Sequence, residues 1–370
     1  MSSLQLDSLE IRNFRAFRHL KMERLARVNL IVGENNVGKT TLLEALQLYA
    51  CRGEPSVALN LLAVRDEVSQ NGQNRLLDPA IKQLFSYAVA PSGRPSLWAR
   101  TAIQIGSLHD SNNSLTMLVG QSQRYIDENR VLRLKLLEED EIAVEASPAF
   151  AVQVGTDPRM VIFPFDTPLR RNGAIQEPIK NVFIPVSGLT NKQLSKLWDK
   201  ITLTDLEKEV IAALRLIAPE VQHLNFVNRE EHSSERIPKV RVAGLPEPIP
   251  LRSMGEGIVR LLGITLALVN AQNGLLLIDE FDSTLHHLVQ VEAWRVIFDL
   301  ALRLNVQVFA TTHSWDCIET YQVATQHNKE VEAVLFSLRN KRGKPGEVAA
   351  ILYDEEDLDA VVSYPVTEVR

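Results

Sequence analysis

Hydrophobic and polar positions divide the N-terminal part of the chain into short runs with different periods. Residues 4–14 roughly alternate apolar and polar side chains, which is typical of a half-buried strand. Residues 28–32 form a short run rich in β-branched residues that ends at Gly33, as expected of a buried strand followed by a loop. From Thr41 to Ala50 the apolar residues recur at helical spacing. The pattern therefore predicts a strand, a glycine-bearing loop and a helix in succession.

The middle of the chain changes from a strand-like to a helical pattern. Short apolar stretches between Gly, Pro, Ser and Asn clusters predict an antiparallel sheet, and they lie at residues 96–105, 115–119, 131–137, 149–154 and 160–165. Between residues 190 and 218 the period becomes helical, and Thr204 with Glu207 predicts a capping box for the second helix. We interpret this segment as a small helical insertion.

Strongly apolar elements follow a proline-rich stretch in the last third of the chain. A long apolar helix is predicted from Gly257 to Asn270, and buried strands are predicted at residues 275–278 and 306–310. Together with the N-terminal pattern, these elements favour an α/β fold. We expect an N-terminal lobe at 1–180, the helical insertion at 181–235 and a C-terminal lobe at 236–370.

Composition narrows the class of protein. The 370 residues carry a net charge of −6, with 45% hydrophobic and 23% charged residues, which is ordinary for a globular protein and excludes a disordered or collagen-like chain. Two cysteines, Cys51 and Cys317, exclude a disulfide scaffold and a cysteine-rich zinc site. Residues 1–30 lack the apolar core of a secretory signal, and the longest apolar run, Leu261 to Val269, is about half of a membrane span. These features predict a soluble, cytoplasmic protein.

A phosphate-binding motif follows the first buried strand. Residues 33–40, GENNVGKT, match the pattern GxxxxGK[ST] at every position. Gly33 and Gly38 let the backbone curl so that N–H groups point at phosphate oxygens, and the next helix directs its positive end at the same anion. Lys39 is expected to reach the β- and γ-phosphates and the Thr40 hydroxyl to ligate Mg²⁺, so the motif predicts ATP with Mg²⁺. The other residues predicted to contact the nucleotide here are Asn35, Asn36 and Thr41.

Two further strand ends carry candidate catalytic residues. Asp279 and Glu280 follow the apolar strand 275–278, at the end of a parallel strand where ligands bind in open α/β sheets. Asp279 is expected to hold magnesium through water, and Glu280 to polarise the attacking water as general base. His313 follows the next strand and suits a γ-phosphate sensor. The alternatives are solvated acids at an ordinary strand end and a structural histidine.

A second candidate anion site precedes the apolar helix. Ser253 and Glu256 fit the capping-box pattern S-x-x-E, which would simply begin the helix. The serine hydroxyl and the N–H groups around Gly255 could instead contact a γ-phosphate. The two interpretations are compatible, because the same exposed N–H groups serve both.

Basic segments and a histidine pair complete the candidates. Residues 11–27 hold six Arg or Lys and one Glu, which fits a nucleic-acid contact or a solvated strand face. Residues 339–344, RNKRGK, are expected to form an exposed turn. His286 and His287 lack further ligands at metal-binding spacing, so we predict no metal site there.

The order of the motifs resembles that of the ABC-type ATPases of the SMC, RecF and OLD group. Residues 9–17, LEIRNFRAF, resemble the N-terminal strand signature of that group. The Walker A motif, a degenerate signature at 253–257, the Walker B motif at 275–280, a D-loop at 281–285 and the His313 switch then follow in the family order. Within this group, the motifs resemble those of the OLD-like AAA-type ATPases of bacterial genomes, several of which serve in anti-phage defence.

This resemblance implies a fold and an assembly. The fold is a P-loop ABC-type ATPase head with a mixed central sheet, an antiparallel β lobe and a small helical insertion. The assembly is a head-to-tail homodimer or higher homo-oligomer with composite ATP sites, in which Ser253 and Gly255 face the nucleotide of the partner subunit.

The sequence also departs from the family pattern. The signature has the sequence SMGEG in place of LSGGQ, and Gln104 and Gln153 are both candidates for the Q-loop glutamine. The 214 positions from Lys39 to Ser253 are too few for long coiled-coil arms. The 57 residues after His313 are too few for a TOPRIM nuclease domain, so a nuclease or toxin would be a separate polypeptide.

Three functions therefore compete. The first is an ATPase switch that controls a partner effector, in anti-phage defence. The second is a RecF-like or SMC-like repair ATPase that acts directly on DNA, for which a basic stripe is expected. The third, a transporter cassette that acts as an energy-coupling module, is disfavoured by the signature and by the N-terminal strand. The net charge of −6 favours the first.

Overall fold

A mixed six-stranded sheet, in the order β16-β15-β3-β14-β13-β9, forms the centre of the computed structural model. The model describes residues 4–67, 81–86, 102–137, 145–157, 160–164, 176–230, 234–344 and 346–363. The strands are β3 (Val28–Gly33), β9 (Asn181–Ile184), β13 (Leu275–Ile278), β14 (Gln307–Thr311), β15 (Ala333–Asn340) and β16 (Val348–Tyr353). All neighbours pair in parallel except β16, which is antiparallel to β15. The carboxyl ends of β3, β13 and β14 therefore meet at one edge of the sheet.

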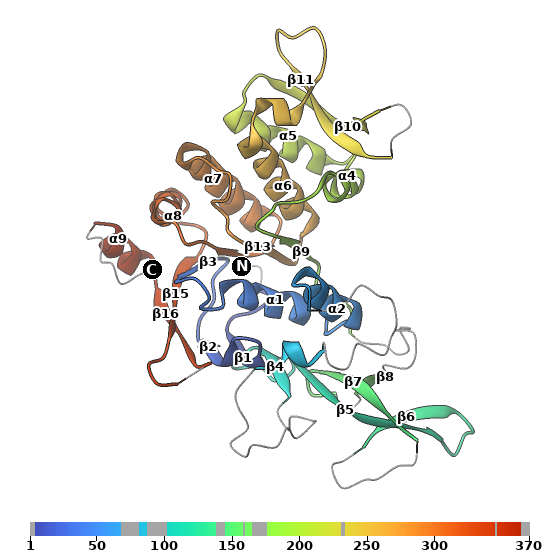
Figure 1. The fold of residues 1–370 in the computed structure, drawn as a ribbon. Coiled ribbons are helices and arrows are strands. Elements are labelled where there is room, and N and C mark those ends of the chain that lie inside the picture. The colour runs from blue at the N-terminus through green and yellow to red at the C-terminus, as the bar shows by residue number, and fades with distance from the viewer. Residues whose placement is uncertain are drawn as a thin grey trace.

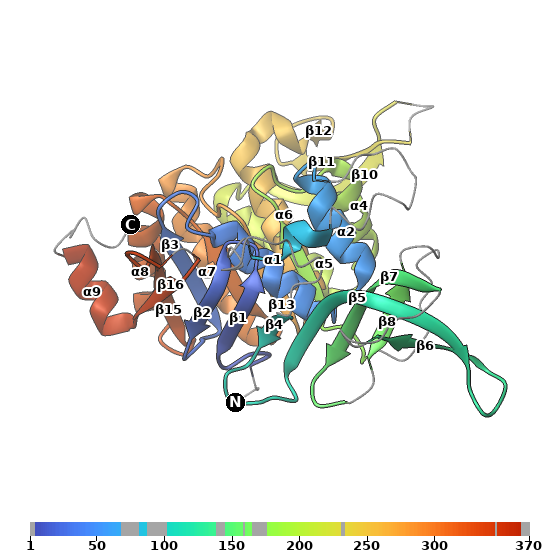
Figure 2. The same ribbon diagram turned by 60° about the horizontal axis from the view of Figure 1, so that its bottom comes forward.

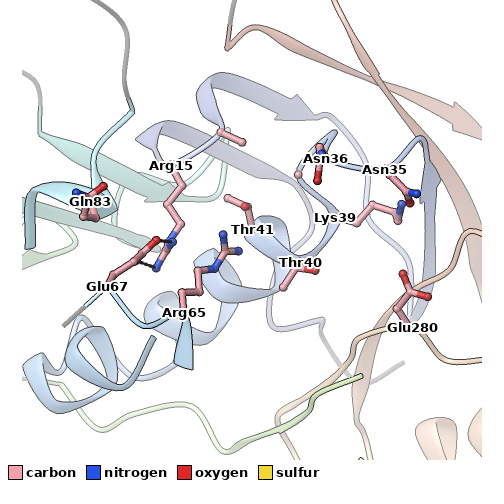
Figure 3. Close-up of a pocket in the computed structure, with 12 residues that line it drawn as sticks. Arg15, Asn35, Asn36, Lys39, Thr40, Thr41, Arg65, Glu67, Gln83 and Glu280 are labelled. Carbon is pink, nitrogen blue, oxygen red and sulfur yellow. Dashed lines mark hydrogen bonds and ion pairs between the residues drawn. The ribbon is translucent and has the colours of Figure 1, made fainter. Parts of the chain in front are cut away.

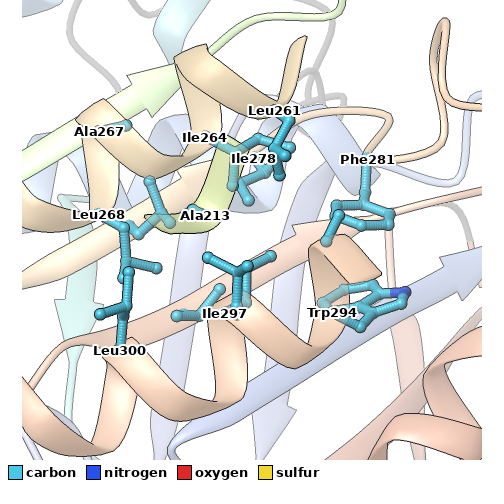
Figure 4. Close-up of a cluster of buried hydrophobic side chains, with 14 of the residues drawn as sticks. Ala213, Leu261, Ile264, Ala267, Leu268, Ile278, Phe281, Trp294, Ile297 and Leu300 are labelled. Carbon is cyan, nitrogen blue, oxygen red and sulfur yellow. The ribbon is translucent and has the colours of Figure 1, made fainter. Parts of the chain in front are cut away.

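Helices cover both faces of this sheet (Figure 1). Helix α1 (Lys39–Ala50) packs on one face, and α6 (Glu256–Asn270), α7 (His287–Arg303) and α8 (Trp315–His327) pack on the other. Along β13, Leu276 and Ile278 join the core of α6 to α8, whereas Leu275 and Leu277 join the core of α1. Each central strand is thus buried on both sides, which explains the uninterrupted apolar runs in the sequence. Figure 4 shows the α6 and α7 side chains packed over Ile278.

An antiparallel sheet of seven strands lies on the outer side of α1 (Figures 1 and 2). Its strands are β1 (Leu9–Phe14), β2 (Phe17–Met22), β4 (Ile103–Gly106), β5 (Ser114–Ile126), β6 (Leu132–Leu136), β7 (Ala146–Val154) and β8 (Val161–Pro164). Helix α2 (Pro55–Val64) follows α1 beside this sheet. The predicted antiparallel sheet is confirmed, although β2 was not expected as a separate strand. Residues 96–101 and 165 of the predicted stretches lie outside the described residues.

A smaller helical and β segment packs against α6. It contains α4 (Asn191–Asp199), α5 (Asp205–Ile217) and a three-stranded sheet of β10 (Val221–Asn228), β11 (Arg236–Val242) and β12 (Ile249–Pro250). The predicted helices between 190 and 218 are confirmed, and the mixed α/β fold class with them. The division of the chain at residues 180 and 235 stays a prediction.

The expected capping box of α5 is wrong. The Thr204 hydroxyl donates to the carbonyl of Ile201 (2.5 Å), and no N–H group at the start of the helix donates to it. A capping box forms instead at α4, where the Gln193 N–H donates to the Thr190 hydroxyl (3.3 Å) and the Thr190 N–H donates to the Gln193 side chain (2.9 Å). No helix among the described residues is long and apolar enough to cross a membrane.

Candidate nucleotide-binding site

Two glycines allow the loop between β3 and α1 to turn closely over its neighbours. Gly33 has φ 149°, and a Cβ placed there would lie 2.7 Å from the carbonyl oxygen of Leu338 on β15. Gly38 has φ 109°, and its Cβ would lie 2.7 Å from the ring of Phe17 on β2. Any other residue at either position would collide with these neighbours in an unfavourable backbone conformation. The phosphate-binding loop therefore packs closely between β15 of the central sheet and β2 of the antiparallel sheet.

Lys39 is buried at the start of α1 and is held by its own loop. Its Nζ donates to the carbonyls of Gly33 (2.7 Å) and Glu34 (3.1 Å). Burial lowers the pKa of Lys39, and the nearby carboxylates of Glu280 and Asp279 act against that shift. A polyphosphate entering the loop would offer this ammonium stronger, charged acceptors.

Asp279 is oriented from two elements at the end of β13. Its Oδ2 accepts from the Thr40 hydroxyl at 2.9 Å, and its Oδ1 accepts from the Thr311 hydroxyl at 2.7 Å. The oxygen of Thr311 in turn accepts from the N–H of Glu280 at 2.9 Å. A hydroxyl and a carboxylate side by side are the hard oxygen ligands that Mg²⁺ prefers. The residues present therefore fit a magnesium site made by Thr40 and Asp279.

Glu280 follows in a left-handed backbone conformation, with φ 48°. Its Oε2 lies 2.6 Å from Nδ1 of His313, and the two side chains are 23% and 56% exposed. Glu280 also lines the pocket in front of the phosphate-binding loop (Figure 3). A carboxylate in this position can accept a proton from a water molecule in the pocket, and the imidazole can hold or share that proton.

The pocket extends away from Glu280 and has a volume of about 660 Å³, within the usual range for ligand sites. Its far end is lined by Arg15 and Ala16 of the N-terminal strand signature and by three residues from outside the motifs, Arg65, Glu67 and Gln83. Asn35, Asn36 and Thr41 also line the pocket, as the sequence predicts.

A cluster of paired charges stabilises that far end. Two nitrogens of the buried Arg15 donate to the two carboxylate oxygens of Glu67, both at 3.0 Å. Its Nε lies 3.2 Å from Glu44 on α1, and Arg65 donates to the same carboxylate at 2.9 Å. Burial raises the pKa of Glu44, and the two arginines partly oppose this effect. The cluster joins the turn between β1 and β2 to the helix that carries the phosphate-binding loop.

The glutamine at this pocket is neither of the two candidates from the sequence. Gln104 lines a different hollow on the outer face of β4, and Gln153 on β7 donates to the carbonyl of Asp157 (2.7 Å). Gln83 is at the pocket because the N–H of Arg15 donates to the carbonyl of Leu84 (2.9 Å). No local sequence pattern marks Gln83, since a tertiary contact brings it there. Thr311 was also missed, although it lies only two residues before His313.

Ser253 and Gly255 are not part of this pocket. Ser253 lies in the 3-10 turn η3 (Leu251–Met254), and both residues are exposed, whereas no residue of 251–257 lines the pocket. The expected capping box at Ser253 is wrong: Gly255 is the N-cap of α6, no side chain caps it, and Glu256 pairs with Arg252 at 2.9 Å. The interpretation of this loop as an anion site stays a prediction.

Two family models match parts of the chain. The model described as an AAA ATPase domain matches residues 5–70, which include β1 to β3 and the phosphate-binding loop. The model described as an AAA domain, putative AbiEii toxin, Type IV TA system, matches residues 200–316, which include Asp279, Glu280 and His313. The first matched segment contains Lys39 and Thr40, and the second contains the acids and the histidine that lie opposite them. We call this end of the pocket, formed by Lys39, Thr40, Asp279, Glu280 and His313, the pocket mouth.

One known protein is similar over most of the chain, and another is similar over a short segment only. The ATP/GTP phosphatase of Helicobacter pylori is 24% identical over 371 residues, which cover 90% of this chain and 92% of that protein. The DNA replication and repair protein RecF of Thioalkalivibrio sulfidiphilus is 46% identical over 45 residues, 12% of each chain.

Among solved structures, an SMC head bound to the C-winged helix domain of ScpA is similar in fold. The TM-score is 0.50 at 12% identity, over 95% of this chain and 98% of that chain. The phosphate-binding loop is therefore complete, AAA ATPase domain models match the segments that carry Lys39 and Glu280, and the fold is that of an SMC head.

Proposed function

We propose that this ATPase hydrolyses ATP and uses the bound nucleotide as a switch that controls a separate partner protein. The observation that carries the proposal is the convergence of Lys39, Thr40, Asp279, Glu280 and His313 at one pocket mouth. The similarity to a protein named ATP/GTP phosphatase supports hydrolysis.

Each residue has a distinct role in the proposed reaction. Lys39 binds the β- and γ-phosphates, and Thr40 with Asp279 would hold Mg²⁺, which would neutralise phosphate charge when bound. Glu280 accepts the proton of the attacking water, and His313 keeps the carboxylate oriented toward the γ-phosphate. Thr311 fixes both Asp279 and the backbone of Glu280, so the two acids keep their relative positions.

The switch requires a second copy of the chain. Ser253 and Gly255 are exposed and belong to no part of their own pocket, which supports a head-to-tail homodimer or higher homo-oligomer in which they face the partner's nucleotide. The partner effector would be a nuclease or toxin in bacterial anti-phage defence, in the cytoplasm. The matched model whose description mentions a toxin system is consistent with this setting.

The test compares the Glu280→Gln variant with Glu292→Gln, a control at a partly exposed position of α7. Glutamine keeps the size of Glu280 but accepts no proton, so hydrolysis should fall at least tenfold while ATP binding persists. The mass in ATP should correspond to a long-lived dimer or larger species. Normal hydrolysis by Glu280→Gln, or a mass that never responds to ATP, would refute the proposal.

A surface observation favours a second candidate, direct action on DNA. The turn between β15 and β16 lies on β2, where the N–H of Arg18 donates to the carbonyl of Gly346 (2.7 Å). The two basic segments of the sequence therefore lie next to each other, and we call their exposed cations the basic hairpin surface: Arg12, Arg18, Lys21, Lys341, Arg342 and Lys344. Two acids, Glu10 and Glu347, pair within it, so six cations face two anions in a chain of net charge −6.

Charge reversal tests this candidate. Among the described residues, Arg18 and Arg342 take part in no ion pair, so both are available to phosphates. Replacing both by Glu should weaken duplex DNA binding and flatten its salt dependence, whereas Arg295→Glu on α7 should not. Salt-insensitive or absent DNA binding by the wild type would exclude this function.

A further inference from the structure

Arg260 is a buried arginine whose acceptors are all backbone carbonyls near the predicted catalytic acids. It lies on α6 and is 6% exposed. Its Nη2 donates to the carbonyls of Asp279 (3.0 Å) and Glu280 (2.9 Å), and its Nη1 donates to the carbonyl of Pro185 (3.0 Å) after β9. One guanidinium therefore joins a helix to the ends of two parallel strands.

Burying the guanidinium of Arg260 costs free energy, so its presence here indicates a specific structural role. Burial lowers the pKa of Arg260, with Asp279 and Asp282 acting against the shift. Its Nε has no hydrogen-bond partner among the described residues. A buried cation that is only partly satisfied costs free energy, and an apolar side chain could fill the same space. The planar fork, which reaches three carbonyls at once, is what an apolar residue or a lysine cannot supply.

The backbone held by Arg260 is that of a strained residue. Glu280 has φ 48°, a conformation that non-glycine residues keep only where the surroundings impose it. Its carbonyl accepts from Arg260, its N–H donates to Thr311, and its carboxylate lies against His313. The direction in which the carboxylate points therefore depends on where α6 places the guanidinium.

The same helix begins at the exposed loop 251–257. Arg260 lies in the second turn of α6, whose N-cap is Gly255. At the first turn, a Cβ placed on Gly257 would lie 3.6 Å from the carbonyl oxygen of Thr284, so the start of α6 lies beside the segment that follows Glu280. Only the first two turns of α6 and the hydrogen bond from Arg260 thus separate loop 251–257 from the backbone of Glu280.

We propose that Arg260 is a positioning residue that couples loop 251–257 to the carboxylate of Glu280. Contact of the loop with the nucleotide of a second copy shifts α6, and Arg260 transmits this shift to the backbone of Glu280. Hydrolysis in each subunit is thereby linked to closure of the dimer. This inference rests on the proposed function, because it assumes that Glu280 is the general base and that the loop faces a partner.

The test uses Arg260→Lys with Arg215→Lys as matched control. Arg215 also donates to two backbone carbonyls, those of Val221 (2.7 Å) and Gln222 (3.0 Å), but far from the pocket. Arg260→Lys should lower kcat at least tenfold while the KM for ATP, ADP affinity and ATP-driven association stay within about twofold of wild type. Arg215→Lys should leave all of these unchanged.

Chemical rescue separates positioning from a general loss of structure. In Arg260→Ala, guanidinium at millimolar concentration should restore part of the hydrolysis, and methylammonium or NaCl at equal ionic strength should not. Full activity of Arg260→Lys, or a loss that guanidinium never restores although ADP still binds, would overturn the inference.

One measurement leaves Arg260 intact and so applies even if its variants fail to fold. In the wild type, ATP should change amide hydrogen exchange in the peptide that contains residues 279–285, and Ser253→Arg should abolish that change while ATP still binds. An equal response in both proteins would overturn the coupling. Normal hydrolysis by Glu280→Gln would instead show that the proposed function has failed.

Discussion

Replacing Thr311 by valine would remove one hydroxyl from the centre of the site and leave its volume almost unchanged. The residue is fully buried, and its hydroxyl donates to Oδ1 of Asp279 (2.7 Å) and accepts from the N–H of Glu280 (2.9 Å). A hydrogen bond to a charged group contributes about 1.5–3 kcal/mol, and a buried N–H left unpaired costs about 1 kcal/mol or more. The variant should therefore lose about 2.5–4 kcal/mol of the free energy of unfolding.

Thr265→Val on α6 is the matched control. Thr265 is equally buried, but its hydroxyl donates only to the carbonyl of Leu261 (2.9 Å), one turn earlier in the same helix. That carbonyl keeps its place in the helix when the hydroxyl is lost, so the control should lose less than about 1 kcal/mol. Thr311→Ser, which keeps the hydroxyl, should stay close to the control.

The assay is urea unfolding followed by tryptophan fluorescence. Trp294 on α7 stacks on Phe281, directly after Glu280, with ring centroids 3.9 Å apart, so its emission reports on this part of the fold. Midpoints should be compared at equal transition slopes, because a chain of this size need not unfold in one step. If Thr311→Val and Thr265→Val unfold at the same urea concentration, the hydroxyl does not hold the two acids and the reasoning fails.

Three further predictions concern charge and assembly. Lys39→Ala should lose ATP binding or hydrolysis, measured by titration and turnover, because a charge-assisted phosphate contact disappears; unchanged values would contradict the assignment. The pKa of Glu44 is higher in the folded than in the unfolded chain, so protonation of Glu44 stabilises the fold below the unfolded pKa of about 4.5. This stabilisation is lost as the pH rises through the folded pKa. Over that pH range, the stability of Glu44→Gln should therefore increase relative to that of the wild type. Thermal midpoints that keep a constant difference across these pH values would contradict this. Finally, mixing inactive Lys39→Ala with inactive Ser253→Arg should restore hydrolysis, since a mixed dimer keeps one intact composite site; inactive mixtures in which mass analysis detects mixed dimers would argue against shared sites.

The features that consist of consecutive residues could be predicted from the sequence. The phosphate-binding loop was predictable because strand, glycines, lysine and helix are consecutive, and the acids after β13 because a doubly buried strand has an uninterrupted apolar run. His313 followed from the same reasoning applied to β14.

Residues placed by tertiary contacts were not predictable in this way. Gln83 reaches the pocket through a hydrogen bond between Arg15 and Leu84, and Arg260 acts on residues about twenty positions away. The capping motifs failed for a different reason. Ser253 and Thr204 match the pattern, but the chain before each helix turns so that Gly255 takes one cap position and Thr204 donates its hydroxyl elsewhere.

The position of β3 has a consequence for how the protein is made. This apolar strand pairs with β14 on one side and β15 on the other, so both of its neighbours are synthesised about 270 residues or more after it. At about 5–20 residues per second, the ribosome needs roughly 15–50 s to deliver the first of them. During that interval β3 has no neighbouring strand, and its free edges can pair with other chains. Residues 28–33 should therefore be open to intermolecular pairing until β14 has been synthesised.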